Sequence, residues 1–230
     1  MKKYEGQEFL KLYDDGGATF MDLEFVKCFF RSCALSITLD PKLRSTVRNV
    51  RLIKCQERGC SLWPAIVEEV LVEDFKTIGL FQTWGAVFKH VTLRGKIGRI
   101  MASPFIAPSL ATAEQQRAFD AANAEYYSNV DWALDISDAQ FEGECDLRRV
   151  PAHLVRRDPE TQVVITREKA MRGEWRKLDL SKTYWAGAIE GFLQEGDPDI
   201  VFVAGKRDRN FRDLLDGLKK LRDAGVAEPD

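Results

Sequence analysis

A three-residue apolar signature that returns at nearly constant spacing is the feature that most constrains how this chain folds. The signature reads apolar, two residues, apolar, one residue, apolar, and Val50, Val70 and Val91 occupy its middle position. These valines are twenty and twenty-one residues apart, which suits one turn of a β-solenoid and is too short for a helical-hairpin repeat. The nine signature positions are Val47, Val50, Leu52, Val67, Val70, Val72, Phe88, Val91 and Leu93. We therefore expect a mainly β chain whose successive turns stack and bury each other's apolar face.

A fourth copy of the signature precedes these three. Leu23, Val26 and Cys28 fit the pattern, and a turn at residues 40–42 accounts for the longer step of twenty-four residues from Val26 to Val50. In most copies the residue between the last two signature positions is polar. This alternation predicts strands with one buried face.

Two kinds of solenoid share this signature. The leucine-rich repeat continues with Asn or Cys, and the copy that starts at Val47 supplies Cys55 at that place. The other copies have Arg31, Phe75 and Lys96, which favours a β-helix over the leucine-rich-repeat alternative. In these columns and in residues 138–141, Asp-Ala-Gln-Phe, the chain resembles pentapeptide-repeat and other right-handed β-helix proteins. The strict five-residue register is not kept, so the resemblance implies a short right-handed β-helix and no particular substrate.

The pattern divides the chain into two parts. We expect a β-solenoid over residues 1–180 and a carboxyl-terminal α/β cap over residues 181–230. Residues 1–17 are interpreted as a cap over the amino-terminal end of the solenoid, because an open end would expose unpaired strand groups. A helix is expected as an insertion near 111–128, and Thr112 starts a capping-box pattern there.

The segments after this insertion are expected to return to the solenoid before the cap begins. Further copies of the signature are predicted at Ile136, Ala139, Phe141 and at Trp175, Leu178, Leu180, with another strand over residues 163–165. The cap itself is predicted to be a helix capped by Ser181, a short strand over residues 200–203 and a final helix closed by Gly225.

Composition excludes some classes of function. The 230 residues include 34 Lys plus Arg and 36 Asp plus Glu, so the net charge of −2 provides no general attraction for nucleic acid. The amino terminus lacks the apolar core of a signal peptide, and no later run is long enough for a membrane span. We therefore expect a cytoplasmic protein without a membrane partner, and no cofactor motif is present in the sequence.

The five cysteines are expected to be reduced thiols. Cys28, Cys33, Cys55 and Cys60 form two pairs with four residues between the members, and four thiolates could hold a tetrahedral zinc ion. Core packing is the preferred interpretation, because buried free cysteine behaves as a small hydrophobic residue.

Acidic residues are densest between residues 131 and 146. Carboxylates on neighbouring strands could supply the acid and base of a glycoside hydrolase, and the candidates are Asp135, Asp138, Glu142 and Glu144. A solvated face is the commoner explanation for such residues and is the preferred interpretation. No serine-histidine nucleophile motif accompanies them.

Two arginine pairs flank a histidine in the next segment. Arg148, Arg149, His153, Arg156 and Arg157 could bind a phosphate, a carboxylate or an acidic partner through planar guanidinium groups. Asp146, Asp158 and Glu160 are close enough in sequence to form ordinary surface ion pairs with them instead.

Together these observations favour a non-enzymatic protein-binding module, such as an adaptor, an inhibitor or an immunity-type factor, that uses the faces of a solenoid. The expected partner is another protein. The alternative is a carbohydrate-active β-helix enzyme that uses the acidic stretch 131–146.

Overall fold

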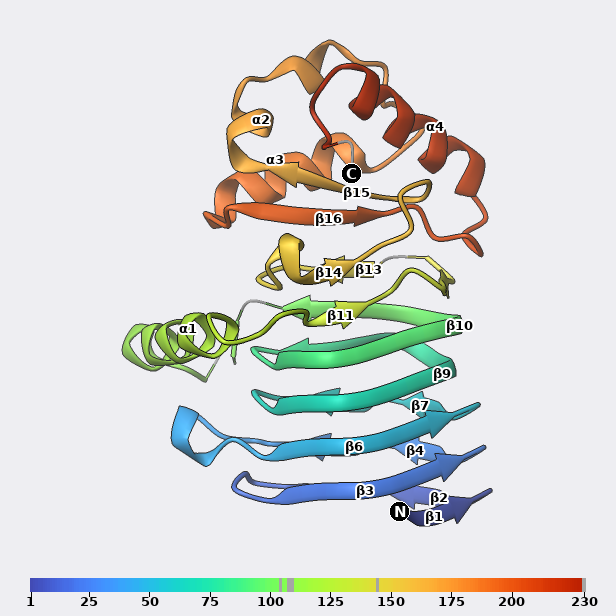
Figure 1. Ribbon diagram of the computed structural model, residues 1–230, viewed down its shortest axis with the longest axis vertical. Helices are drawn as coiled ribbons and strands as arrows, with labels where there is room; N and C mark the ends of the chain where they lie inside the picture. Colours follow the sequence, from blue (N-terminus) through green and yellow to red (C-terminus); the bar gives the residue numbers. More distant parts are fainter. Residues whose placement is uncertain (104, 107–109, 144, 229–230) are drawn as a thin grey trace.

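A computed structural model describes residues 1–103, 105–106, 110–143 and 145–228. The protein is mainly β, and most of its strands belong to one largely parallel sheet system, with helices on one side and at the carboxyl-terminal end (Figure 1). The strands of this system are β1 (Lys2–Glu5), β2 (Glu8–Leu10), β3 (Thr19–Val26), β4 (Phe29–Arg31), β5 (Ala34–Leu35), β6 (Thr46–Ile53), β7 (Gln56–Arg58), β8 (Ser61–Leu62), β9 (Ile66–Trp84), β10 (Val87–Ser103), β11 (Leu134–Asp135), β12 (Ala139–Phe141), β13 (Cys145–Leu147) and β14 (Val155–Arg156).

The strands are arranged in three rows of parallel neighbours. The first row runs β1, β3, β6, β9, β10, β11, β14. The second row contains β2, β4, β7 and the middle of β9, and the third contains β5, β8 and the end of β9. Strands β9 and β10 are long and pass through all three rows, and β12 and β13 pair with the later parts of β10. Between residues 46 and 103, all of which are described, no helix interrupts the strands, whereas a leucine-rich repeat carries a helix or 3-10 segment in each unit.

The predicted valine column lies inside the first row. Val50 pairs with Val70, and Val70 pairs with Val91, across adjacent parallel strands. All three side chains are buried, with 4%, 5% and 3% of their surface exposed. β-Branched side chains fill a pleated surface well, and each valine is covered by the strands on both sides. Of the nine signature residues over 47–93, seven are buried, and Val47 and Leu52 are half-buried against the same core.

The first copy of the signature is displaced by three residues from its predicted place. Leu23, and not Val26, pairs with Val50, and Phe25 pairs with Leu52. The copy is thus Phe20, Leu23 and Phe25, and the step to the next copy is longer than predicted. The copy predicted at Ile136, Ala139 and Phe141 is also displaced, because Leu134, and not Ala139, pairs with Val91 and continues the valine column, while Ala139 pairs with Gly95.

A second column of equivalent residues has a left-handed backbone. Asp22, Asn49, Glu69 and His90 each precede the central signature residue, and each has a φ angle between 51° and 57°. This conformation bends the strand locally, and Asn and Asp adopt it more readily than most residues. The side chains meet along the stack, since Asn49 Nδ2 donates to Asp22 Oδ1 over 2.5 Å and His90 Nδ1 lies 2.5 Å from Glu69 Oε1.

The inserted helix forms where the capping box predicts it. Helix α1 (Ala113–Tyr127) begins after Thr112, whose side chain and that of Gln115 satisfy each other's backbone amides. Several contacts attach the helix to the strands, among them a hydrogen bond from the Tyr126 hydroxyl to Glu68 over 3.1 Å. The Arg44 guanidinium lies 4.8 Å from the centre of the buried Phe119 ring, and the Tyr127 hydroxyl accepts a hydrogen bond from the Phe88 amide over 3.3 Å.

The carboxyl-terminal elements cover the last strands of the stack (Figure 1). They are β15 (Gln162–Thr166), α2 (Arg167–Met171), the 3-10 helix η3 (Glu174–Lys177), α3 (Trp185–Glu195), β16 (Asp199–Val203) and α4 (Phe211–Asp223). Strand β15 pairs antiparallel with β16 in a separate sheet. Residues 162–180 therefore pack with the cap and do not continue the stack, and the copy predicted at Trp175 is a 3-10 helix. The predicted cap helices and strand are present, although Tyr184, and not Ser181, precedes α3.

Residues 1–17 are not a cap. Strand β1 pairs in parallel with β3, and β2 pairs in parallel with β4, so this segment is itself the first layer of the stack. Among the described residues, no strand covers the outer edge of either. None of the described helices is long and apolar enough to cross a membrane.

Candidate functional site

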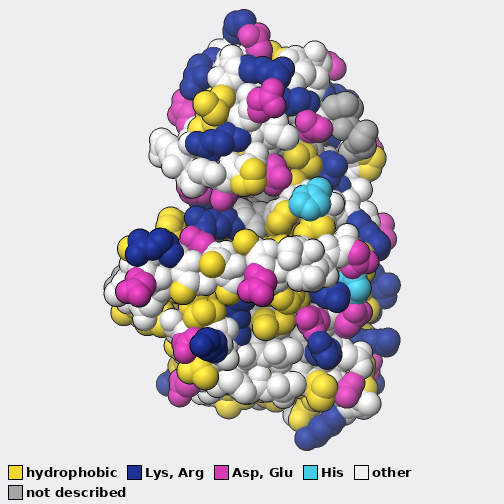
Figure 2. Space-filling view, turned by 60° about the vertical axis from the view of Figure 1, so that its left-hand side comes forward, with side chains coloured by type: hydrophobic (Ala, Val, Ile, Leu, Met, Phe, Trp, Pro, Cys, Tyr) yellow, Lys and Arg dark blue, Asp and Glu magenta, His cyan; other side chains and the backbone are white. Residues whose placement is uncertain are grey.

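A cleft of about 530 Å³ lies between helix α1, the turn after β13 and the loop that joins α3 to β16. Figure 2 shows the surface on this side of the molecule, which is hollowed between α1 and the carboxyl-terminal elements. The residues that line the cleft are Asp120, Asn123, Ala124, Tyr127, Ser128, Arg149, Val150, Pro151, His153, Glu195, Gly196, Asp197, Pro198 and Asp199. Four carboxylates thus meet one arginine and one histidine.

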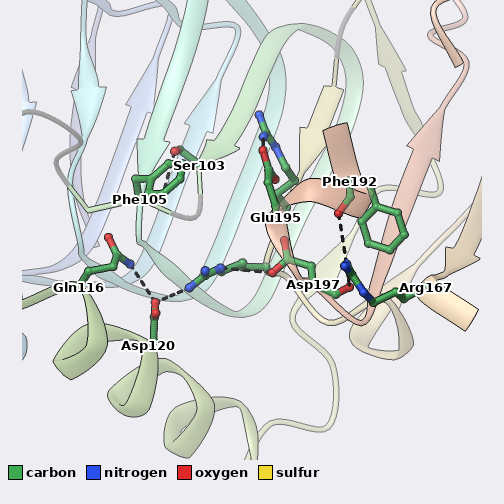
Figure 3. A network of polar contacts seen from close by, with 10 residues as sticks. Ser103, Phe105, Gln116, Asp120, Arg167, Phe192, Glu195 and Asp197 are labelled. Atoms are coloured by element: carbon green, nitrogen blue, oxygen red, sulfur yellow. Dashed lines mark hydrogen bonds and ion pairs between the residues drawn. The ribbon is translucent and has the colours of Figure 1, made fainter. Parts of the chain in front are cut away.

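Arg149 links the two walls of the cleft. Its guanidinium forms ion pairs with Asp120 of α1 and, over 3.3 Å from Nε to Oδ1, with Asp197 of the α3–β16 loop. Gln116 also donates to Asp120 over 2.8 Å, which fixes the carboxylate on the helix (Figure 3). The neighbouring Arg148 bridges two carboxylates in the same way, but beside the cleft rather than on its wall.

Beside the cleft, the carboxyl group of Asp146 has a raised pKa although it forms an ion pair with Arg148. Arg148 Nε lies 2.8 Å from Asp146 Oδ2, and the same guanidinium binds Glu195. Burial raises the pKa of Asp146 to about 6, although the positive charge of Arg148 acts in the opposite direction. Burial likewise raises the pKa of Asp197, against the lowering effect of Arg149.

Three of these carboxylates are incompletely paired. Among the described residues, Asp146 Oδ1, Glu195 Oε2 and Asp197 Oδ2 are buried without a hydrogen-bond partner. A buried acceptor without a donor costs about 1–3 kcal/mol, more when it is charged. The cleft therefore carries more negative charge and more acceptor capacity than its own arginines neutralise.

Local structure explains why the α3–β16 loop presents its acids here. Gly196 ends α3 with a φ of 86°, a left-handed conformation in which glycine meets no steric penalty. Arg167 then donates to the carbonyl oxygens of Leu193, over 2.6 Å, and Asp197, over 3.4 Å. It also donates to the Phe192 carbonyl oxygen over 3.5 Å (Figure 3). A cation at the end of a helix satisfies free carbonyl groups, and this one holds the loop against the helix. Asp199 is fixed separately, because its Oδ1 accepts the Ala152 amide over 3.0 Å.

The five basic residues that the sequence groups together are separated in the structure. Arg149 and His153 line the cleft, and Arg148 lies beside it. Arg156 stacks on the Trp132 ring, 4.1 Å from its centre, and Arg157 lies within 3.5 Å of the Gln162 carbonyl oxygen. Internal carboxylates already bind the two arginines nearest the cleft, which leaves less capacity for the anion that the sequence predicts.

The acidic candidates do not converge on a cavity. Asp135 Oδ1 accepts hydrogen bonds from the Ser137 amide and hydroxyl, Asp138 is exposed, and Glu142 lies 3.6 Å from Arg207. Glu144 lies outside the described residues. Within the described chain, Asp135, Asp138 and Glu142 line neither the cleft, nor the cavity at the amino-terminal end of the stack, nor the small cavity between β13 and α3.

The four paired cysteines belong to two separate stacks. Cys55 lies over Cys28 and Cys60 over Cys33, and each thiol lies near a backbone carbonyl oxygen. Burial raises the pKa values of Cys55 and Cys60 to about 11, which disfavours the thiolates that zinc requires. Among the described residues no group of three or more His, Cys, Asp or Glu side chains is placed to hold a metal ion.

Most of the cleft could not be predicted from the sequence. Asp120 comes from the inserted helix, and Glu195, Asp197 and Asp199 come from a loop far along the chain. One signal was available, since three acids in the run Glu-Gly-Asp-Pro-Asp at a predicted helix end mark a turn rich in charge. The partnership between that turn and α1 depends on long-range packing and leaves no local trace.

Comparison of the chain with protein-family models, with curated proteins and with solved structures finds no match.

Proposed function

We propose that this protein is a non-enzymatic protein-binding module, built on a short right-handed β-helix, and that its cleft receives a basic segment of the partner. The three rows of parallel strands support the β-helix, because each row would be one face of the coil. A rigid stack of this kind can hold α1 and the α3–β16 loop at a fixed separation, which is what a preformed binding cleft needs.

The observation that carries the proposal is the surplus of carboxylates. Asp120, Glu195, Asp197 and Asp199 line the cleft, and Arg149 is the arginine among them. A negative, partly enclosed surface attracts lysine and arginine side chains and suppresses binding of acidic segments.

A pair of isosteric substitutions tests the role of the charge. Asp120→Asn and Asp199→Asn retain the oxygen that accepts from Gln116 and from the Ala152 amide, but remove two negative charges from the cleft. Asp223→Asn, at the exposed end of α4, is the matched control. We expect a short oligo-arginine peptide to bind the parent and the control equally, and the double variant about tenfold more weakly, which corresponds to roughly 1.4 kcal/mol.

The natural partner can be identified with the same three proteins as bait. Cross-linking in the source cells, followed by mass spectrometry, should recover a partner that the double variant loses and the control retains. Its cross-linked segment should be rich in lysine or arginine. Recovery of the same proteins by all three baits, or a cross-linked segment that is acidic or uncharged, would contradict the proposal.

A further inference from the structure

The amino-terminal end of the stack is open and apolar. Tyr4 and Phe9 of the first layer pack on Phe25 and Phe30 of the second, with ring centres 5.1–5.7 Å apart. A cavity of about 440 Å³ opens among these rings and the neighbouring aliphatic side chains. On the same layer three large apolar residues are exposed, Leu10 at 45%, Leu12 at 56% and Tyr13 at 62%. Apolar surface of this kind next to unpaired strand edges favours association with another chain.

The main chain of the first layer divides its hydrogen bonds in an orderly way. Gln7 and Lys11 lie on either side of β2. The Gln7 carbonyl accepts from the Phe29 amide, and the Lys11 amide donates to the Arg31 carbonyl, so the alternate residues Gln7, Phe9 and Lys11 face the second layer. The other residues of β2, Glu8 and Leu10, therefore direct their N–H and C=O groups outward, away from the stack.

The other two sides of the layer follow the same rule. Gly6 donates to the Val26 carbonyl, which leaves the main-chain groups of Glu5 directed outward. Leu12 accepts from the Ala34 amide and Asp14 donates to the Ala34 carbonyl, which leaves Tyr13 in the same position. The open edge thus presents outward groups at Glu5, Glu8, Leu10 and Tyr13.

This edge is complementary to itself. A two-fold axis through Phe9, perpendicular to the stack, places Glu8 of one copy opposite Leu10 of the other, and Glu5 opposite Tyr13. All four residues direct their main-chain groups outward, so each opposed pair has the arrangement of a hydrogen-bonded antiparallel pair. Such an axis also matches the pitch of the coil, because the part of one end that protrudes meets the part of the other that recedes.

The charges agree with the same axis. It brings Lys3 opposite Asp15 of the second copy. Both side chains are exposed in the single chain, where Lys3 also forms a solvent-exposed ion pair with Glu5 over 3.1 Å. The central contact is Phe9 against Phe9, next to the open cavity. We propose that two copies of this chain join end to end through residues 2–16, forming a symmetric dimer with the two carboxyl-terminal caps at its outer ends. This interface is independent of the cleft proposed above, which lies at the other end of the stack.

Charge exchange across the interface tests the proposal without disturbing the fold. Lys3→Asp and Asp15→Lys each place like charges opposite one another, whereas the double variant restores the attraction with its sign reversed. Lys219→Asp, on the exposed surface of α4, is the control. The measurement is sedimentation equilibrium over a range of protein concentrations at low salt.

We expect the parent and the control to reach twice the monomer mass, each single variant to dimerise at least fivefold more weakly, and the double variant to recover most of the loss. Hydrogen exchange should also show the Glu8 and Leu10 amides to be protected in the dimer and unprotected at dilutions where the chain is monomeric. A parent that stays monomeric throughout the concentration range would overturn the proposal. It would indicate that the amino-terminal end of the stack pairs with a strand of a different protein. A dimer with the same stability in both single variants, or with unprotected Glu8 and Leu10 amides, would place the interface elsewhere and overturn it equally.

Discussion

Gly217 of α4 lies so close to Trp185 of α3 that a β-carbon on the glycine would be 2.6 Å from the indole Cδ1 atom. The indole is buried, stacks on Phe202 and donates from Nε1 to the Leu214 carbonyl over 3.0 Å. It therefore has little freedom to move aside. The close approach of the two helices depends on the absence of a side chain at position 217.

Alanine at this position should destabilise the cap. Overpacking of a well-packed core typically costs about 1–3 kcal/mol, and we expect Gly217→Ala to lower the free energy of unfolding by that amount. Gly187→Ala is the matched control, because Gly187 is exposed in α3 and a β-carbon there meets nothing within 4 Å. Alanine has a higher helix propensity than glycine, so Gly187→Ala should be up to about 1 kcal/mol more stable than the parent. Urea unfolding of the three proteins measures both changes, and equal stability of the two variants would contradict this explanation.

A charge in the valine column should unfold several layers together. Val70 is 5% exposed between Val50 and Val91, so Val70→Asp would bury a carboxylate with no partner on either side. We expect a loss of at least several kcal/mol, a large part of the roughly 5–15 kcal/mol that stabilises a typical domain. Lys27→Asp introduces the same residue at an exposed corner with a φ of 53°, where Asp is readily accommodated, and should melt close to the parent. Thermal melts followed by circular dichroism compare the two, and similar melting of Val70→Asp and the parent would show that the column does not stabilise the fold.

These two cases show what the sequence could predict about the fold. The valine column was visible because one buried row imposes the same apolar spacing on every layer. The first copy was misplaced because Phe20, Leu23, Phe25 and the alternative Leu23, Val26, Cys28 satisfy the same pattern, and only strand pairing distinguishes them. The first layer was mistaken for a cap because its short strands lack the full signature. Its role depends on parallel pairing with β3 and β4.

The residues of the cleft were harder to predict from the sequence than the fold. The sequence identified Arg149 as a candidate, but its partners Asp120 and Asp197 lie far from it in sequence and reach it only when α1 and the cap lie against the stack. Charge patterns in sequence count residues and do not reveal which charges already neutralise each other. The basic stretch therefore suggested an anion site where the structure has a surplus of carboxylates.

His90 should make stability depend on pH. Its ring nitrogens lie 2.5 Å from Glu69 Oε1 and 2.6 Å from Asp131 Oδ1, and the ring stacks on Trp132. Slight burial lowers the pKa of His90, but the hydrogen bonds to Asp131 and Glu69 outweigh it and raise the pKa above 6.5. A raised pKa in the folded state stabilises the protein below the unfolded value of about 6.5, and this contribution is lost as the pH rises through the folded value.

Substitution of the ring isolates this effect. The melting temperature of His90→Gln should fall furthest below that of the parent near pH 5.5, and the gap should narrow toward pH 8.5. Asp131→Asn is the control, because it retains the ring and removes one of the two carboxylates that raise the pKa. The melting temperature of Asp131→Asn should lie closer to that of the parent than does that of His90→Gln, and this difference should also narrow as the pH rises. A gap that widens with rising pH would show that the imidazole bridges the two layers in its neutral form.

Asp146 should change the stability in the same direction as His90, but at lower pH. Burial raises its pKa to about 6 in the folded state, whereas an unfolded chain has the ordinary value of about 3.8. The folded protein then binds the proton more tightly than the unfolded chain, so stability falls as the pH rises from about 4 to about 6. Asp146→Asn cannot ionise and escapes this loss. Its stability relative to the parent should therefore improve steadily across that interval and remain constant above it.

A second acid provides a control of opposite sign. Partial burial of Asp158 raises its pKa, but the contact with Lys206, 2.8 Å from Nζ to Oδ2, and the Thr161 hydroxyl outweigh it and lower the pKa below 3.8. Asp158→Asn should therefore become less stable relative to the parent as the pH rises through about 4, while Asp146→Asn becomes more stable. Chemical unfolding of the three proteins at several pH values between 3.5 and 8 separates the two trends. If the Asp146→Asn difference does not change with pH, Arg148 and the surrounding water compensate the buried charge, and Asp146 is an ordinary ion-pair partner.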